Sequence, residues 1–162
     1  MAKWKAAFLK SLDPEYDTEE SFTFGPPATE AELSALETAI SEKLPEDLRE
    51  LLLEFNGIKD SDGETYFFDT TEMPTAAEYY REWDWPTDML LECSSNILYV
   101  CQENGFSEMW GVAVKPFGSF QYGQVVAFNH DEIAYAEEPD ELFVVPYQSL
   151  IKLVEADFKT TE

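Results

Sequence analysis

Residues 26–57 read PPATEAELSALETAISEKLPEDLRELLLEFNG and predict two consecutive helices. Thr29 and Glu32 fit a capping box, in which the Thr29 hydroxyl accepts from the Glu32 amide and the Glu32 carboxylate accepts from the Thr29 amide. The apolar residues that follow recur at helical spacing and form one stripe: Leu33, Leu36, Ile40 and Leu44. The first helix is therefore expected to begin after Thr29 and to end near Lys43.

A second helix is expected at Pro45, because proline suits the first turn of a helix. Its apolar positions again form one stripe: Leu48, Leu51, Leu52 and Phe55. Asn56 and Gly57 follow, and both residue types favour the left-handed conformation that ends many helices. The two helices are thus predicted to form a hairpin-like pair.

The C-terminal two thirds of the chain change character. Five short runs are rich in valine, isoleucine and aromatic residues, and predict strands of an antiparallel sheet: 65–69, 96–102, 109–115, 124–129 and 142–145. Within the third run, Trp110 is expected in the core and Gly111 is expected to allow close packing of neighbouring strands.

Further helical spacing occurs outside these runs. Residues 3–12 place Trp4, Ala7 and Phe8 on one helix face, residues 76–85 fit a helical turn, and residues 147–158 fit a closing helix. The order of elements predicts an α+β fold, with an antiparallel sheet of about five strands and helices packed on one face. One domain covering residues 1–162 is expected at this length.

The charge of the chain is strongly one-sided. Asp and Glu number 34 and Lys and Arg number 10, so the formal net charge is −24, beyond the magnitude of about 2–8 that suffices for solubility of a small domain. Such a field attracts cationic partners and disfavours nucleic acids and anionic membranes, which are themselves polyanionic. A basic protein partner is therefore predicted; the alternative is that the acidity only aids solubility.

Cysteine usage and the N-terminal residues point to the cytoplasm. Cys93 and Cys101 are the only cysteines and form no CxxC pair that would begin a zinc site. The residues MAKWKAAFLKSL lack the apolar run of a secretory signal, and no run reaches the roughly 20 apolar residues of a membrane span. We expect a cytoplasmic protein with no metal and no cofactor.

A cluster of aromatic and acidic residues is the predicted partner-binding site. Rigid aromatic side chains with an anionic rim are typical of protein interfaces. The predicted residues are Tyr79, Tyr80, Glu82, Trp83, Asp84, Trp85 and Asp88. The alternative is that these aromatic residues cover one end of the hydrophobic core.

Catalytic chemistry has little support in the sequence. Residues 60–64 partly resemble a calcium loop but lack its full set of oxygen ligands, so a hairpin turn at Asp62 and Gly63 is favoured. His130 lies in a segment of turn composition, and Cys101 lies in a strand-like run without a nucleophile motif. No catalytic residue is predicted, although a hydrolase that uses two of the many carboxylates stays an alternative.

Several motifs of the chain resemble the SUKH superfamily, the SMI/KNR-like immunity proteins. The resemblance rests on residues 26–33, on residues 44–49 with Leu52, and on Asn56-Gly57. It continues through Glu103-Asn104, Trp110-Gly111, Val125-Val126, the turn at 129–131 and the closing helix, and so covers residues 22–158. Residues 79–88 match no motif of that family.

This resemblance implies an α+β fold without enzymatic activity. In bacteria such proteins bind and neutralise toxin domains, many of them nucleases, and in fungi they act as regulatory scaffolds. Nucleases that hold a phosphate backbone are basic at their active sites, so an acidic protein can cover that surface. The expected function is toxin neutralisation, with a regulatory scaffold as the alternative.

Overall fold

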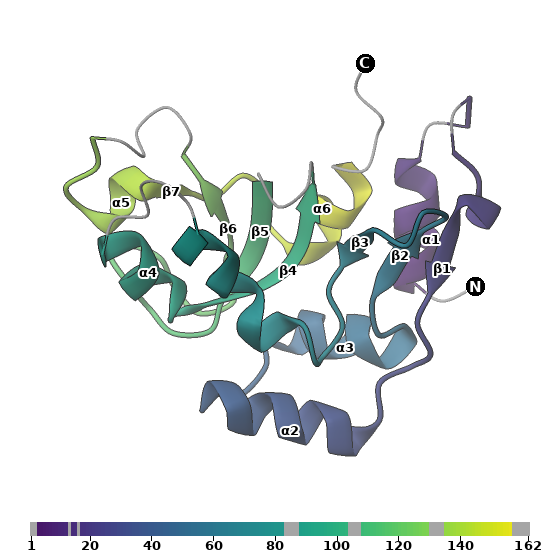
Figure 1. Ribbon diagram of the computed structural model, residues 1–162, viewed down its shortest axis with the longest axis horizontal. Helices are drawn as coiled ribbons and strands as arrows, with labels where there is room; N and C mark the ends of the chain where they lie inside the picture. The colour runs from purple at the N-terminus through teal and green to yellow at the C-terminus, as the bar shows by residue number, and fades with distance from the viewer. Residues whose placement is uncertain are drawn as a thin grey trace.

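The computed structural model describes residues 3–12, 14–15, 17–82, 88–103, 108–129 and 135–156. Within these residues, seven strands form one antiparallel sheet in which each strand pairs with the next along the chain (Figure 1). The strands are β1 (Phe22–Phe24), β2 (Ile58–Asp60), β3 (Thr65–Phe67), β4 (Ile97–Glu103), β5 (Glu108–Ala113), β6 (Val125–Phe128) and β7 (Phe143–Val144). The meander leaves β1 and β7 as the two edges.

The helices lie before, within and after the sheet. They are α1 (Lys3–Ser11), α2 (Glu30–Ile40), α3 (Glu46–Glu54), α4 (Asp88–Ser94), α5 (Pro139–Leu142) and α6 (Leu150–Ala156). Two 3-10 segments, η1 (Glu19–Ser21) and η2 (Met73–Glu82), complete the described elements. Figure 1 shows α1 beside β1 and β2 at one end of the sheet, and α4 and α5 beside β7 at the other.

The α2–α3 pair forms much as its sequence predicts. The Glu32 amide donates to Thr29 Oγ1 at 3.1 Å, and the Thr29 amide donates to the Glu32 carboxylate at 2.7 Å, so the capping box is confirmed. The helix ends at Ile40 instead of near Lys43, because Ser41 adopts a left-handed φ of 59° and its amide caps the last turn. Pro45 is the N-cap of α3.

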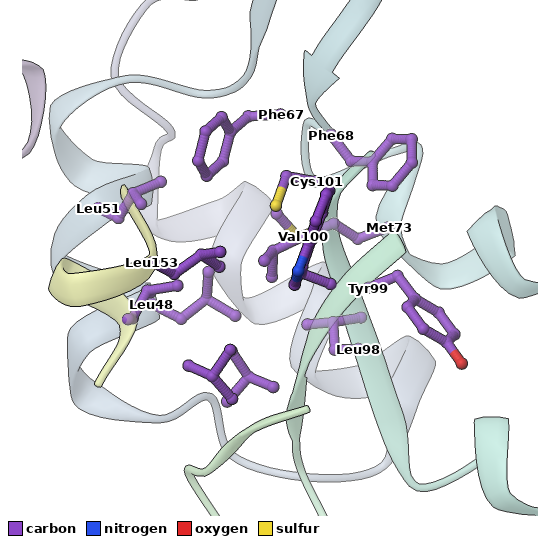
Figure 2. Packing of buried hydrophobic residues seen from close by; sticks show 14 of the residues in the cluster. Leu48, Leu51, Phe67, Phe68, Met73, Leu98, Tyr99, Val100, Cys101 and Leu153 are labelled. Carbon is purple, nitrogen blue, oxygen red and sulfur yellow. The ribbon is translucent and has the colours of Figure 1, made fainter. Parts of the chain in front are cut away.

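Helices contact both faces of the sheet. Figure 2 shows Leu48, Leu51 and Leu153, from α3 and α6, on one side of β4, and Phe68 and Tyr99 on the other. The second side receives η2 and α4, which both contact β4. The predicted α+β class with an antiparallel sheet is confirmed, and the structure adds helices on the second face.

The strand count is higher than the predicted five. The five predicted runs correspond to β3, β4, β5, β6 and β7, and the additional strands are β1 and β2. Both are three residues long. β1 pairs with a distant segment, Phe24 with Ile58, whereas β2 pairs with β3 through the predicted turn at Asp62 and Gly63. Three residues are too few to show alternation, so neither strand has a pattern of its own.

The central strands β4 and β5 depend on a glycine. A Cβ atom added to Gly111 would lie 2.4 Å from Ile97 Cγ2 and 3.0 Å from the Leu98 carbonyl oxygen. Trp110 is 7% exposed and belongs to the core cluster. The predicted roles of Trp110 in the core and of Gly111 in close strand packing are both confirmed.

Candidate partner-binding surface

The predicted partner-binding residues begin on η2 and end on α4. Tyr79, Tyr80 and Glu82 lie in the last part of η2, where the structure describes the backbone only. Asp88 is the first residue of α4, and its side chain is exposed. Trp83, Asp84 and Trp85 lie outside the described residues, so the joint use of these seven residues stays a prediction.

A buried hydroxyl pair joins α4 to the sheet. Ser94 Oγ, at the end of α4, and Tyr99 Oη, on β4, lie 2.9 Å apart in a hydrogen bond. The two residues are 5% and 1% exposed. Burial raises the pKa of Tyr99, because the interior disfavours the phenolate. The protonated hydroxyl therefore holds α4, and with it Asp88, at a fixed place against β4.

Two carboxylates organise the start of η2. Asp69 Oδ1 accepts from the amides of Thr71 and Glu72 at 2.8 and 2.9 Å, and the Glu72 carboxylate accepts from the Asp69 amide at 3.2 Å. Burial acts to raise the pKa of Asp69, but the hydrogen bond from the Thr71 hydroxyl, at 2.6 Å, and those from the two amides outweigh it and lower the pKa. Burial and the neighbouring Asp69 charge raise the pKa of Glu72. Neither carboxylate lines the two hollows at the α2–α3 corner that are described below.

The remaining candidates for metal binding or catalysis are residues 60–64, Cys101 and His130. Asp60 Oδ1 accepts from the amides of Asp62 and Glu64 at 2.9 and 2.8 Å, and Gly63 has a φ of +84°, which confirms the predicted hairpin turn. In the part of the chain that the structure describes, no group of three or more His, Cys, Asp or Glu side chains is placed to hold a metal. Cys101 is fully buried. His130 lies outside the described residues.

An acidic surface lies where α2 meets α3, and it contains two adjoining hollows. The first has a volume of about 390 Å³ and is lined by polar residues: Ser34, Glu37, Thr38, Ser41, Glu42 and Lys43. Its carboxylates are partly neutralised, because Glu37 lies 3.3 Å from Arg49 and 3.5 Å from Lys43, and Glu42 lies 3.9 Å from Lys115. The charges of this hollow are therefore largely compensated within the chain.

The second hollow, here called the Tyr122 hollow, is smaller and of different character. Its volume is about 230 Å³. It is lined by Pro45, Glu46, Asp47, Leu48, Val112, Tyr122, Gly123 and Leu150. Leu48, Val112 and Leu150 are buried, whereas Glu46 and Asp47 are exposed at the first turn of α3. The Tyr122 hollow thus combines apolar walls with an acidic rim.

Tyr122 is fixed at the boundary between the two hollows. Its hydroxyl donates to the Lys43 carbonyl oxygen at 2.8 Å, while the residue is 46% exposed. Burial of the hydroxyl, followed by the charges of Glu37, Glu42 and Glu46, raises the pKa of Tyr122. The aromatic ring therefore has a defined position within a negative field.

Sequence reasoning did not find this site. Its residues come from four separate segments, namely α3 with the residue before it, β5, the turn between β5 and β6, and α6. The one local signal is an aromatic residue in a polar turn, Gln121-Tyr122-Gly123, and a lone turn tyrosine does not distinguish an interface from an ordinary surface.

No helix among the described residues has the length and apolar character needed to cross a membrane.

Comparison with known proteins agrees with the fold. A search of curated proteins finds no match to this chain. The model of the SMI1 / KNR4 family (SUKH-1) matches residues 27–155, which span α2 through most of α6 and include both hollows. The match covers well over half of the chain and confirms the resemblance noted in the α2–α3 region. This chain belongs to the SMI1 / KNR4 family (SUKH-1).

Proposed function

We propose that this chain is a non-catalytic immunity protein that binds a bacterial toxin domain and neutralises it. The observation that carries the proposal is membership of the SUKH-1 family together with a net charge of −24, which at the α2–α3 corner leaves the surface of Glu46 and Asp47 exposed at the rim of the Tyr122 hollow. Members of this superfamily include bacterial immunity proteins. A basic toxin domain, such as a nuclease that grips phosphates, is the partner that this surface complements best.

The proposed mechanism is steric and electrostatic. Long-range attraction raises the rate at which a cationic domain encounters the acidic surface. Exposed aromatic side chains then supply contact area that excludes water at the centre of the interface. Tyr122 is a described residue of this type, and the predicted cluster at Tyr79 to Asp88 is a second candidate contact on the same chain.

Co-expression with the products of adjacent genes tests the proposal. Each neighbouring open reading frame is induced in a bacterial host with and without this chain. We expect one product to arrest growth and this chain to restore it. The purified pair is expected to form a stoichiometric complex whose Kd weakens about tenfold or more as NaCl rises from roughly 0.05 to 0.2 M.

The control is a folded, unrelated protein of similar negative charge, which must fail to restore growth. If no adjacent gene product is toxic, or if this chain binds the toxic product without protecting the cell, the immunity role is wrong. Stable recovery of one non-toxic host protein in place of a toxin would instead support the regulatory scaffold.

A further inference from the structure

We propose that the Tyr122 hollow receives one arginine or lysine side chain from a basic protein partner. The proposal rests on the proposed function only for the partner being a basic protein. The shape, walls and charges of the hollow are properties of this chain alone.

The size of the hollow fits a side chain better than a small-molecule ligand. Pockets for drug-sized ligands usually enclose about 300–1,000 Å³, whereas this hollow encloses about 230 Å³. The larger neighbouring hollow of about 390 Å³ is lined by polar and charged residues, and its carboxylates already face Arg49, Lys43 and Lys115. The Tyr122 hollow is therefore the better binding site for a single inserted side chain.

The walls of the hollow suit an aliphatic stem. Leu48, Val112 and Leu150 are 0%, 2% and 3% exposed, and Pro45 is also buried. They leave only a small apolar area at the hollow, beside the half-exposed ring of Tyr122. The methylene groups of lysine and arginine pack on such apolar surface while the charged head stays in water.

The rim of the hollow suits a cationic head. Glu46 and Asp47 are exposed, and neither takes part in an ion pair among the described residues. Glu37 and Glu42 in the adjoining hollow have such partners. Carboxylates without a cation inside the chain are available to pair with one from outside, and a charge-assisted hydrogen bond from arginine is directional. Charge complementarity thus selects a basic side chain.

Tyr122 is the third feature of the hollow that favours a basic side chain. Its hydroxyl is tied to the Lys43 carbonyl oxygen, so the half-exposed ring loses little freedom when a partner binds. A cation within about 6 Å of a tyrosine ring is attracted to the negative face of the ring. Rigid aromatic residues of this kind are frequent hot spots of protein interfaces.

Nuclear magnetic resonance of the full-length, 15N-labelled chain tests whether the Tyr122 hollow binds a basic side chain, and it needs no known partner. The probes are the peptide acetyl-Gly-Arg-Gly-amide and its citrulline analogue, which has the same length but no charge. We expect the arginine peptide to shift the amide signals of Leu48 and Gly123 in a saturable manner, and the citrulline peptide to leave them unchanged. Equal effects of both peptides, or shifts spread evenly over all exposed carboxylates, would overturn the proposal.

Matched variants distinguish binding at the Tyr122 hollow from attraction by the overall negative charge of the chain. The pair Glu46→Gln with Asp47→Asn, and separately Tyr122→Ala, are expected to weaken arginine-peptide binding by about tenfold, as loss of a hot-spot contact does. The control pair Asp62→Asn with Glu64→Gln removes the same charge at the β2–β3 turn and is expected to leave binding unchanged. Dispersed amide signals in every variant verify folding.

The toxin complex distinguishes the two proposals. If the chain neutralises a toxin but the Glu46/Asp47 and Tyr122 variants bind that toxin as tightly as the unaltered chain, the proposed insertion of a basic side chain into the Tyr122 hollow is wrong and the immunity function is supported. If the arginine peptide binds as described but no adjacent toxin is neutralised, the insertion is supported and the immunity function is wrong.

Discussion

At the scale of single residues, Tyr99 shows how the core accommodates a polar group. Its hydroxyl lies 2.9 Å from Ser94 Oγ, and both residues are buried. A buried polar group left without a partner costs about 1–3 kcal/mol. The pair therefore stabilises the contact between α4 and β4 only while both partners are present.

The raised pKa of Tyr99 predicts an alkaline loss of stability. The unfolded chain loses this proton near a pKa of about 10, whereas burial keeps the native phenol protonated to higher pH. The stabilisation is thus complete below pH 10 and is lost as the pH rises through the native pKa. Tyr99→Phe is expected to cost about 1 kcal/mol at pH 7 and to lose less stability than the unaltered chain between pH 9 and 11.

Urea unfolding at pH 7, 9 and 11 measures this difference. Tyr135→Phe is the control, because Tyr135 is 81% exposed and folding changes its surroundings little. An alkaline loss of the same size in Tyr99→Phe and in the unaltered chain would contradict the argument.

At the scale of elements, α1 is part of the core although it precedes the family match at residues 27–155. Phe8 is fully buried, and its ring contacts those of Phe22, Phe24 and Phe67 in edge-to-face geometry at 5.1, 5.6 and 6.2 Å. These contacts join α1 to β1 and β3 at one end of the sheet. α1 is therefore expected to fold together with the rest of the chain.

A carboxylate from α3 caps α1. The Glu54 carboxylate accepts from the Trp4 amide at 2.9 and 3.0 Å and from the Lys5 amide at 3.0 Å, so it satisfies two of the amides left free at a helix start. Glu54→Ala is expected to destabilise the chain by about 1–2 kcal/mol, as the loss of other helix caps does. The measurement is the free energy of unfolding in urea.

Glu50→Ala is the matched control for the Glu54 cap. Among the residues that the structure describes, the Glu50 side chain has one ion pair, an exposed one with Lys3 at 3.4 Å, and such pairs contribute about 0–1 kcal/mol. An equal loss in the two variants would show that Glu54 acts through its charge and not as a cap.

The elements also show what the sequence could predict. The capping box at Thr29, the stripe of α3 and the helical face of α1 are local patterns, and the structure confirms each of them. β1 escaped prediction because its pairing with the distant β2, not its own three residues, makes it a strand. β2 escaped prediction because three residues show no alternation, although its turn to β3 was predicted. The end of α2 was misplaced because Leu44 continues the apolar stripe, although Ser41 has already turned the backbone.

The candidate site was less predictable than the fold for the same reason. The Tyr79 to Asp88 cluster is contiguous and therefore visible in the sequence, but the Tyr122 hollow forms only when α3, α6 and the β5–β6 turn meet. Apolar walls such as Leu48 and Leu150 read as ordinary core positions until the fold leaves a hollow beside them. Charge alone predicted an acidic surface without giving its place.

At the scale of the whole molecule, the net charge of −24 acts on stability as well as on binding. Ion pairs such as Lys5–Glu19, at 2.7 Å, and Arg49–Glu37, at 3.3 Å, offset part of the repulsion. With 34 acidic and 10 basic residues, most carboxylates have no cation to pair with. Folding brings these like charges together, and their repulsion favours the unfolded chain.

Salt is therefore expected to stabilise this chain. The Debye length falls from about 30 Å at 0.01 M to about 10 Å at 0.1 M ionic strength, so repulsion between distant carboxylates is screened before close ion pairs are. The free energy of unfolding in urea should rise by on the order of 1 kcal/mol between these two NaCl concentrations, roughly the energy of one close charge pair in water. A variant with Glu20→Lys, Glu64→Lys and Glu137→Lys, all at exposed positions, is expected to show a smaller rise because less repulsion is left to screen. A fall in the free energy of unfolding with salt would contradict this argument. It would mean that attraction within the ion pairs outweighs repulsion between the carboxylates, so that the acidic residues stabilise the fold and partner binding relieves no repulsion.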